Sequence, residues 1–538
     1  MSTPLLQNYL TASAGRRPEA TAVLYNQQSL TYGLLEQRSN QLARLLKQAG
    51  CRRGDRIALM IPKSLPAIAG MFGSAKADCI YIPIDVTGAP QRVARILESC
   101  EPTAILAAGA GAGLVEKMLA AGSIAPGTRL GWLDFDSARL PDFRPDFLWS
   151  DVEAMPAGPV DYANSSSDIV HILFTSGSTG VPKGVMITHA NVMHFVEWAI
   201  RYFGARPTDR VSGHPPLHFD LSTFDVYGTI LAGAELHLVP PEMSLLPHKL
   251  AEFIRRSKLT QWFSVPSILN HMAKFDVVRQ DDFPALERLL WCGEAFPVPA
   301  LIYWMQRLPK LTFTNLYGPT EATIASSFYT MPGCPADEKE AVPIGMACEG
   351  EKLLVLDEQM NPAPAGQIGD LYIGGLGLSP GYWRDPEKTA GVFVPDPADA
   401  SERIYKTGDL AYLGENGMVY MVGRADTQIK HRGYRIELGE IETAFHAVDG
   451  IEECAVVAVE VHGFEGLKIC CGYVPRQGVE LSPLALRQKV TDTLPHYMMP
   501  SQWMVFERLP LNTSGKIDRR QLKELFQQQE EQAAAAGR

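Results

Sequence analysis

The sequence lacks the spacings, charge clusters and long apolar runs that mark several common classes of protein. Its nine cysteines include no C-x-x-C pair and no ligand-like spacing with histidine, so we expect reduced thiols and no zinc site. Lys and Arg are scattered along the sequence and the formal net charge is −11, so no cluster of positive charge of the kind that binds nucleic acid is visible. No run of about 18 uncharged apolar residues occurs, and the first ten residues do not resemble a secretory signal. We therefore predict a cytoplasmic protein with neither nucleic acid nor a membrane as partner.

Short β-rich runs alternate with helical stretches through the first 340 residues. Residues 56–61 and 79–83 read as strands and 34–46 as a helix, and the same alternation returns with a strand at 233–239 and a helix at 248–256. Such alternation is typical of parallel α/β sheets. The fold class predicted is α/β, with a large N-terminal body of stacked α/β subdomains.

The texture of the sequence changes twice after this body. Residues 343–421 are rich in Gly, Pro and short β runs, which predicts a small β unit. Beyond Gly423, helices at 439–447 and 483–494 flank a β run at 454–461, which predicts a small C-terminal α+β domain. We expect a core at 1–425, a mobile C-terminal domain at 426–529, and a frayed helical or disordered tail at 530–538.

The strongest local signal is the segment LFTSGSTGVPKGV at 173–185. A strand leads into a loop of small hydroxylic and Gly residues closed by one lysine, an arrangement that exposes N–H and O–H donors to phosphate oxygens. It is not a Walker A loop, because Gly184 rather than Ser or Thr follows Lys183. The string closely resembles the phosphate loop of the adenylate-forming superfamily, which includes adenylation domains of nonribosomal peptide synthetases, acyl-CoA ligases and luciferases.

The resemblance recurs in the same order along nearly the whole chain. The matching segments are YIPID (81–85), NLYGPTE (315–321), GDLYIGG (369–375), YKTGDL (405–410), GRADTQIK (423–430), RGYRIE (432–437) and NTSGK (512–516). Members of this superfamily use ATP with Mg²⁺ to make acyl- or aminoacyl-adenylates, and we expect the same substrate and metal here.

The resemblance assigns roles to individual residues of the nucleotide site. Tyr317 offers an aromatic face to adenine, Thr320 a donor to the α-phosphate, and Glu321 an oxygen ligand to Mg²⁺. Asp409 resembles the carboxylate that binds the ribose hydroxyls, and Arg424 the basic residue near the same sugar. The full set expected to bind ATP is Thr175, Ser176, Gly177, Ser178, Thr179, Gly180, Lys183, Gly293, Glu294, Asn315, Leu316, Tyr317, Gly318, Pro319, Thr320, Glu321, Asp409, Arg424 and Lys516.

Two further residues matter because the C-terminal domain of this superfamily rotates between an adenylating and a thioester-forming arrangement. Asp426 falls at the position of the interdomain hinge. Lys516 matches the catalytic lysine that this domain delivers during adenylation, where an ammonium can bridge the substrate carboxylate and the α-phosphate.

Asp220 is the most informative residue for the substrate. In amino-acid-activating members the aspartate of this F-D-x-S segment pairs with the substrate ammonium, which would otherwise be a costly buried charge. The alternative is that Asp220 caps a helix beginning near Leu221. When the flanking motifs are aligned with the family, the resemblance assigns the rest of the substrate pocket wall to Leu221, Phe224, Phe263, Leu290, Cys292, Leu316, Ile324 and Ala325.

This wall carries no charge, so we expect a small or medium uncharged side chain. Proline is the first prediction, because proline-activating enzymes have a similar Asp-Leu-Phe opening. Cys292 is similar to the corresponding residue of D-alanine-activating ligases, and a β-amino acid could also place its ammonium near Asp220, so these alternatives stay open.

The sequence contains no H-H-x-x-x-D-G condensation motif, and no G-G-x-S carrier motif follows Lys516. We therefore predict a freestanding amino acid adenylation enzyme that passes its product to the phosphopantetheine thiol of a separate carrier protein. A small-acid CoA ligase and an inactive nucleotide-binding scaffold are the competing readings.

Overall fold

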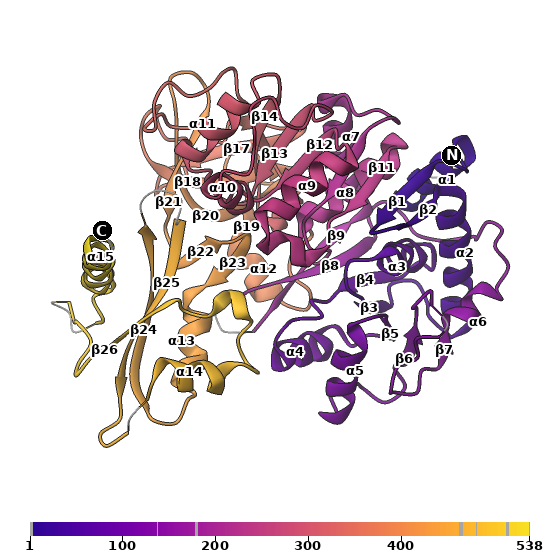
Figure 1. Ribbon diagram of the computed structural model, residues 1–538, viewed down its shortest axis with the longest axis horizontal. Coiled ribbons are helices and arrows are strands. Elements are labelled where there is room, and N and C mark those ends of the chain that lie inside the picture. Colours follow the sequence, from indigo (N-terminus) through magenta and orange to yellow (C-terminus); the bar gives the residue numbers. More distant parts are fainter. Residues whose placement is uncertain are drawn as a thin grey trace.

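The computed structural model describes residues 4–136, 138–177, 181–461, 466–479, 481–512 and 516–536. Most of these residues form a large body, and the C-terminal residues form a small domain packed on one side of it (Figure 1). The body contains two large sheets and a smaller β unit, so the α/β prediction with a small C-terminal domain is confirmed.

The first large sheet has seven strands in the order β7-β6-β5-β3-β4-β8-β9. Its strands are β3 (Arg56–Met60), β4 (Ile80–Pro83), β5 (Ala104–Ala107), β6 (Arg129–Trp132), β7 (Phe147–Leu148), β8 (Ile169–Thr175) and β9 (Lys183–Thr188). All pairs are parallel except β8 with β9. The apolar runs of β3, β4 and β5 are buried, as both-face burial of a parallel sheet requires.

The second large sheet has nine strands in the order β16-β15-β14-β13-β12-β10-β11-β1-β2. Its strands are β1 (Thr21–Tyr25), β2 (Gln28–Thr31), β10 (Arg210–Gly213), β11 (Glu235–Leu238), β12 (Gln261–Ser264), β13 (Arg288–Cys292), β14 (Thr312–Tyr317), β15 (Ser327–Thr330) and β16 (Met346–Ala347). The central strands are parallel and both ends of the sheet are antiparallel.

Helices fill the space between and around the two sheets. They are α1 (Leu6–Arg16), α2 (Tyr32–Gln48), α3 (Leu65–Lys76), α4 (Pro90–Cys100), α5 (Gly111–Ala120), α6 (Trp149–Glu153), α7 (His189–Phe203), α8 (Asp220–Ala232), η1 (Pro241–Leu245), α9 (Pro247–Ser257), α10 (Pro266–Lys274), α11 (Val298–Arg307) and η2 (Thr320–Ala322). The hydroxyl of Tyr81 on β4 lies 3.0 Å from that of Tyr227 on α8, so the two sheets share one core through this layer. Helix α8 is buried along nearly its whole length, as a helix between two sheets must be.

The small β unit contains β17 (Glu351–Leu356), β18 (Gly369–Gly375), β19 (Phe393–Pro395), β20 (Arg403–Leu413), β21 (Val419–Arg424) and helix α12 (Pro386–Val392). Its strands pair in the order β17-β18-β20-β19, with β21 added to β20. The pairing of β20 with β21 sets Asp409 opposite Arg424.

The C-terminal domain begins with a hairpin and continues as an α+β unit. Its elements are β22 (Gln428–His431), β23 (Tyr434–Glu437), α13 (Leu438–His446), β24 (Ile451–Val461), β25 (Gly466–Pro475), α14 (Pro483–Val490), η3 (His496–Met498), β26 (Gln502–Val505) and α15 (Arg519–Ala536). Two hydrophobic clusters made of residues of this domain form its core.

Two predicted C-terminal boundaries differ from the structure. Helix α14 ends at Val490 rather than 494, because a proline at 495 disfavours helical geometry in the residue before it. Helix α15 extends through residues 530–536 of the predicted tail, so of the two alternatives the structure has the helical one there. Gln, Glu and Ala in this segment are good helix formers.

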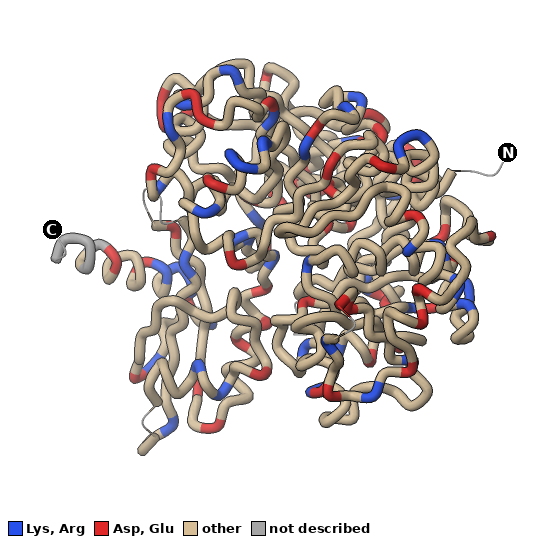
Figure 2. The backbone as a smooth tube through the Cα atoms, turned by 45° about the vertical axis from the view of Figure 1, so that its right-hand side comes forward, with Lys and Arg blue, Asp and Glu red and all other residues tan. Residues whose placement is uncertain are grey.

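Charged residues of both signs are interspersed over the body and the C-terminal domain (Figure 2). No basic stripe marks a nucleic-acid surface on the described residues.

Candidate active site

A pocket with a cavity volume of about 110 Å³ lies where the C-terminal hairpin meets the body, and it opens to solvent. Its wall consists of Arg92, Leu173, Phe174, Thr175, Ser176, His218, Phe219, Asp220, Leu221, Val265, Gly293, Gly318, Pro319, Thr320, Thr407, Asp409, Arg424, Gln428, Lys430, Gly433, Tyr434, Arg435 and Tyr497.

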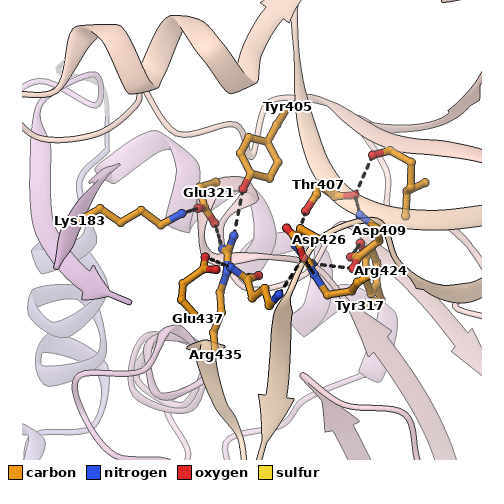
Figure 3. Close-up of polar contacts among 12 residues, drawn as sticks. Lys183, Tyr317, Glu321, Tyr405, Thr407, Asp409, Arg424, Asp426, Arg435 and Glu437 are labelled. Atoms are coloured by element: carbon orange, nitrogen blue, oxygen red, sulfur yellow. Dashed lines mark hydrogen bonds and ion pairs between the residues drawn. The ribbon is translucent and has the colours of Figure 1, made fainter. Parts of the chain in front are cut away.

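One end of the pocket holds the predicted ribose carboxylate. Asp409 is 2% exposed and accepts from Arg424 Nη1 at 2.6 Å and from the Tyr317 hydroxyl at 2.5 Å (Figure 3). The Tyr317 ring itself lies beside Lys430, whose ammonium is 5.2 Å from the ring centroid. The carboxylate is therefore held rigidly toward the pocket, while Lys430 shares the aromatic face predicted for adenine.

A buried ion cluster surrounds Glu321, the predicted Mg²⁺ ligand. Its carboxylate accepts from Arg435 Nη1 at 2.7 Å and from the Tyr382 hydroxyl at 2.7 Å, and lies 3.2 Å from Lys183 Nζ (Figure 3 shows the two cations). Burial alone would raise the pKa of Glu321, but Arg435 and Lys183 hold it well below its usual range. Burial lowers the pKa of Lys183 to about 8. The Glu321 carboxylate thus links Lys183 on strand β9 of the body to Arg435 on strand β23 of the C-terminal hairpin.

The described part of the predicted phosphate loop lies at the pocket. Thr175 and Ser176 line the pocket, and the buried Thr175 hydroxyl has no hydrogen-bond partner among the described residues. A Cβ on Gly177 would lie 2.2 Å from the carbonyl oxygen of Val181, so only glycine fits there. The predicted positions Ser178, Thr179 and Gly180 lie outside the described residues. A buried polar group without a partner is rare in folded proteins, so the Thr175 hydroxyl is a candidate for a ligand contact.

Asp220 is the first residue of α8 and lines the pocket. Phe219, not Asp220, occupies the N-cap position. The Thr320 hydroxyl, predicted to contact the α-phosphate, donates to Asp220 Oδ2 at 2.8 Å in this arrangement. Burial raises the pKa of Asp220 to about 6, against the effect of the Thr320 hydrogen bond. Within the described residues this buried carboxylate accepts from a hydroxyl and a backbone group and is influenced by the charge of Lys430, and it is available for a cationic ligand group.

The other predicted wall residues are not exposed to the pocket. Apart from Leu221, they are at most 2% exposed and form part of the central core: Phe224, Phe263, Leu290, Cys292, Leu316, Ile324 and Ala325. These seven side chains pack against one another in the core, and their contact with a substrate stays a prediction.

Two predicted nucleotide residues have structural partners. Glu294 accepts from the Ser267 N–H at 2.9 Å and from the Gly433 N–H at 2.7 Å. Asn315 donates to the Pro343 carbonyl at 2.9 Å. Gly293, Gly318 and Pro319 line the pocket, as predicted.

The hairpin β22–β23 supplies site residues to which the sequence assigned no role. Lys430, Gly433, Tyr434 and Arg435 all line the pocket. Tyr434 packs edge-on against Phe219 with ring centroids 4.9 Å apart. The segments GRADTQIK and RGYRIE were visible as family matches, but which face of the C-terminal domain meets the pocket could not be seen in them.

Lys516 lies elsewhere in this arrangement. It is exposed, its N–H donates to Asn512 Oδ1 at 3.0 Å, and it is not part of the pocket wall. Asp426, the predicted hinge, is half-exposed and pairs with Arg424 at 2.6 Å. The structure therefore shows the arrangement in which the hairpin, and not Lys516, faces the pocket.

Comparison with known proteins identifies the family. A family model described as AMP-binding enzyme matches residues 10–383, and one described as AMP-binding enzyme C-terminal domain matches residues 440–516. The chain belongs to the AMP-binding enzyme family. This confirms the superfamily resemblance drawn from the motifs.

Individual relatives agree with this assignment. The chain is 34% identical over 518 residues to tyrocidine synthase 3 of Brevibacillus parabrevis, covering 96% of this chain but only 8% of that protein. The solved adenylation domain AlmE of Vibrio cholerae has the same fold, with a TM-score of 0.83 and 24% identity over 97% of this chain and 98% of that one. PA1221, a nonribosomal peptide synthetase protein with adenylation and carrier domains, matches with a TM-score of 0.78 and 26% identity over 96% and 84% of the two chains.

AMP-binding enzymes use ATP with Mg²⁺, and the cluster at Glu321 fits one part of a magnesium site. The protein offers a single carboxylate here, and the described residues contain no group of three or more metal-binding side chains. Mg²⁺ is commonly held by one or two carboxylates together with substrate phosphates, so Glu321 is sufficient as the protein's ligand. Because Arg435 bonds this carboxylate in the present arrangement, the metal fits only when the hairpin withdraws.

No helix in the described part of the chain is both long and apolar enough to cross a membrane.

Proposed function

We propose that this AMP-binding enzyme activates the carboxylate of an uncharged amino acid with ATP and transfers the aminoacyl group to a phosphopantetheine thiol. The observation that carries the proposal is Asp220, a buried carboxylate on the pocket wall that accepts a hydrogen bond from the neutral Thr320 hydroxyl. A substrate ammonium is the cation that such a carboxylate would pair with, since an unpaired buried charge costs several kcal/mol on the order-of-magnitude scale.

In the first half-reaction, which forms the adenylate, we assign separate roles to the other site residues. A carboxylate oxygen of the amino acid attacks the α-phosphorus of ATP, and the bond to the pyrophosphate oxygen breaks. Asp409 would bind the ribose, and the Thr175 hydroxyl and Lys183 would contact phosphate oxygens. Mg²⁺ bound at Glu321 would neutralise phosphate charge. Lys516 would have to approach by rotation of the C-terminal domain about Asp426.

The second half-reaction suits the arrangement in the structure. A thiol sulfur attacks the carbonyl carbon of the adenylate, and AMP leaves. Lys516 is withdrawn, while Gly433 and Tyr434 of the hairpin line the pocket. We propose a carrier protein as the thiol donor, which the relationship to proteins containing adenylation and carrier domains supports.

The test is pyrophosphate exchange with ATP over a panel of amino acids, aryl acids and fatty acids. We expect exchange with uncharged amino acids and none with benzoates or fatty acids. Transfer to a phosphopantetheinylated carrier, compared with transfer to CoA, then separates a carrier ligase from a CoA ligase. Exchange with an aryl acid and silence with every amino acid would refute the proposal, and silence with all acids would favour the inactive scaffold.

A further inference from the structure

The amino acid side of the pocket ends abruptly beyond Asp220. From this closure we infer, resting on the proposed function, that the enzyme accepts amino acids whose side chain is no larger than a methyl group. Glycine and alanine belong to this class, and unbranched β-alanine has the same width. Proline, the first prediction from the sequence, does not belong to it.

Aromatic rings close one side of the space. The Phe224 ring meets Phe195 edge-on at 5.5 Å and Phe263 edge-on at 5.8 Å between centroids. All three side chains are at most 2% exposed. Edge-to-face contacts at these distances are the preferred geometry of aromatic pairs, so the three rings form a stable cluster that leaves no gap.

The cluster cannot retreat to make room. The cavity behind Phe224, bordered by Phe203 and Gly228, has a volume of about 10 Å³, roughly that of one water molecule. A Cβ on Gly228 would already touch the Phe224 ring at 3.0 Å. A larger substrate would therefore have to displace packed side chains, which a close-packed core resists.

The opposite side is closed by small neutral groups. Cys292 is fully buried, and its sulfur lies 3.9 Å from the Ile324 carbonyl oxygen. Burial raises the pKa of this thiol to about 12, so it is neutral at physiological pH. The pocket wall includes Asp220, Leu221, Val265 and Gly293, whereas Phe224, Phe263 and Cys292 do not line it, so the open space ends before these three side chains.

The expected preference for small amino acids follows from the free-energy cost of placing a side chain that is too large in a closed apolar pocket. One methylene in a hydrophobic pocket changes specificity by about 10- to 200-fold. The proline ring and the valine side chain both exceed a methyl group by more than one carbon. We therefore expect kcat/KM for alanine or glycine to exceed that for proline, valine and leucine by at least about 100-fold.

The experiment measures kcat/KM for pyrophosphate exchange with glycine, alanine of both configurations, β-alanine, proline, valine and leucine. The full chain is compared with Phe224→Ala and Cys292→Ala, which open the space from opposite sides. We expect at least one of them to raise the ratio of proline or valine to alanine by about 100-fold. Phe283→Leu is the matched control, because Phe283 is a buried ring in a separate hydrophobic cluster of the body, and its truncation should leave this ratio unchanged.

The outcomes separate the two proposals. Wild-type exchange with proline or leucine at a rate equal to that with alanine overturns the size limit and leaves amino acid activation intact. A shift in the ratio in Phe283→Leu as large as in Phe224→Ala also overturns it, because general loosening of the protein would then explain the change. Silence with every amino acid refutes the proposed function itself. Melting temperatures and AMP binding verify that each variant is folded.

Discussion

The Arg435–Glu321 ion pair offers the sharpest test of how the C-terminal hairpin is held in the pocket. Arg435→Met removes the charge but keeps an unbranched side chain of similar reach. Glu321 would keep Lys183 and the Tyr382 hydroxyl as partners, so the variant does not leave a buried carboxylate unpaired. The substitution therefore weakens the hairpin's attachment without damaging the body.

The size of the effect follows from the lost interaction. A hydrogen bond to a charged group contributes about 1.5–3 kcal/mol. The Arg435 side chain is 18% exposed and that of Glu321 is fully buried, so solvent screening is limited. At about 1.4 kcal/mol per factor of ten, the equilibrium between hairpin-in and hairpin-out arrangements should shift by about 10- to 150-fold toward the latter.

Hydrogen exchange at the Gly433 amide measures this equilibrium directly. This N–H donates to Glu294 at 2.7 Å only while the hairpin lies in the pocket. If opening is fast compared with exchange, the exchange rate should rise by the same factor as the opening equilibrium. Transfer from a chemically supplied aminoacyl-adenylate to the carrier should slow, while pyrophosphate exchange should persist.

Arg432→Met serves as the control, because Arg432 is exposed and lies on the same hairpin. It should leave Gly433 protection and the transfer rate unchanged. If Gly433 exchanges no faster in Arg435→Met than in Arg432→Met, the ion pair does not hold the hairpin and the reasoning fails.

Two other substitutions test the roles of single charged groups. Lys516→Ala should slow adenylation by about 10²–10³, the usual cost of losing one preorganised donor, yet transfer of a premade adenylate should stay near the wild-type rate; equal loss in both half-reactions with an intact melting temperature would contradict this. Asp220→Asn should abolish amino acid activation with nucleotide binding nearly intact. Because burial raises the pKa of Asp220 from 3.8 to about 6, the folded protein binds more protons than the unfolded one between these values, and wild-type stability falls as pH rises through that window. The free energy of unfolding of the Asn variant should consequently exceed that of wild type by up to about 3 kcal/mol at pH 8 but by little at pH 3.5, as measured by denaturant unfolding. A difference that does not depend on pH would show that titration of the Asp220 carboxylate is not its cause.

Much of the fold was predictable because strands and helices leave local patterns. The buried runs of β3 and β4 and the apolar strand before the loop at Thr175 appear directly in the sequence. Asp220 and Asp409 were predicted as site residues, and both line the pocket. Asp220 is the first residue of helix α8 and Asp409 lies within strand β20, so regular local structure helps to fix where each side chain points.

Residues of the C-terminal domain were harder to place. The motif of Lys516 predicted its chemistry, yet the lysine is exposed and remote from the pocket in this arrangement. Arg435 received no role, yet it contacts Glu321. A motif shows which side chains a domain carries. A hinged domain can turn either of two faces toward the pocket, and which face it turns depends on its contacts with the body, which is distant in sequence.

The sequence by itself determined the family and the order of its motifs, since these depend on residue types at short spacings. Only the tertiary structure decided that Lys183, Tyr382 and Arg435 converge on one carboxylate from three separate segments. It also decided that the wall beyond Asp220 is filled by rings from helix α7, helix α8 and strand β12. The physical reason is that the identity of a side chain is local, whereas the free volume around it and the charge facing it depend on how distant segments pack.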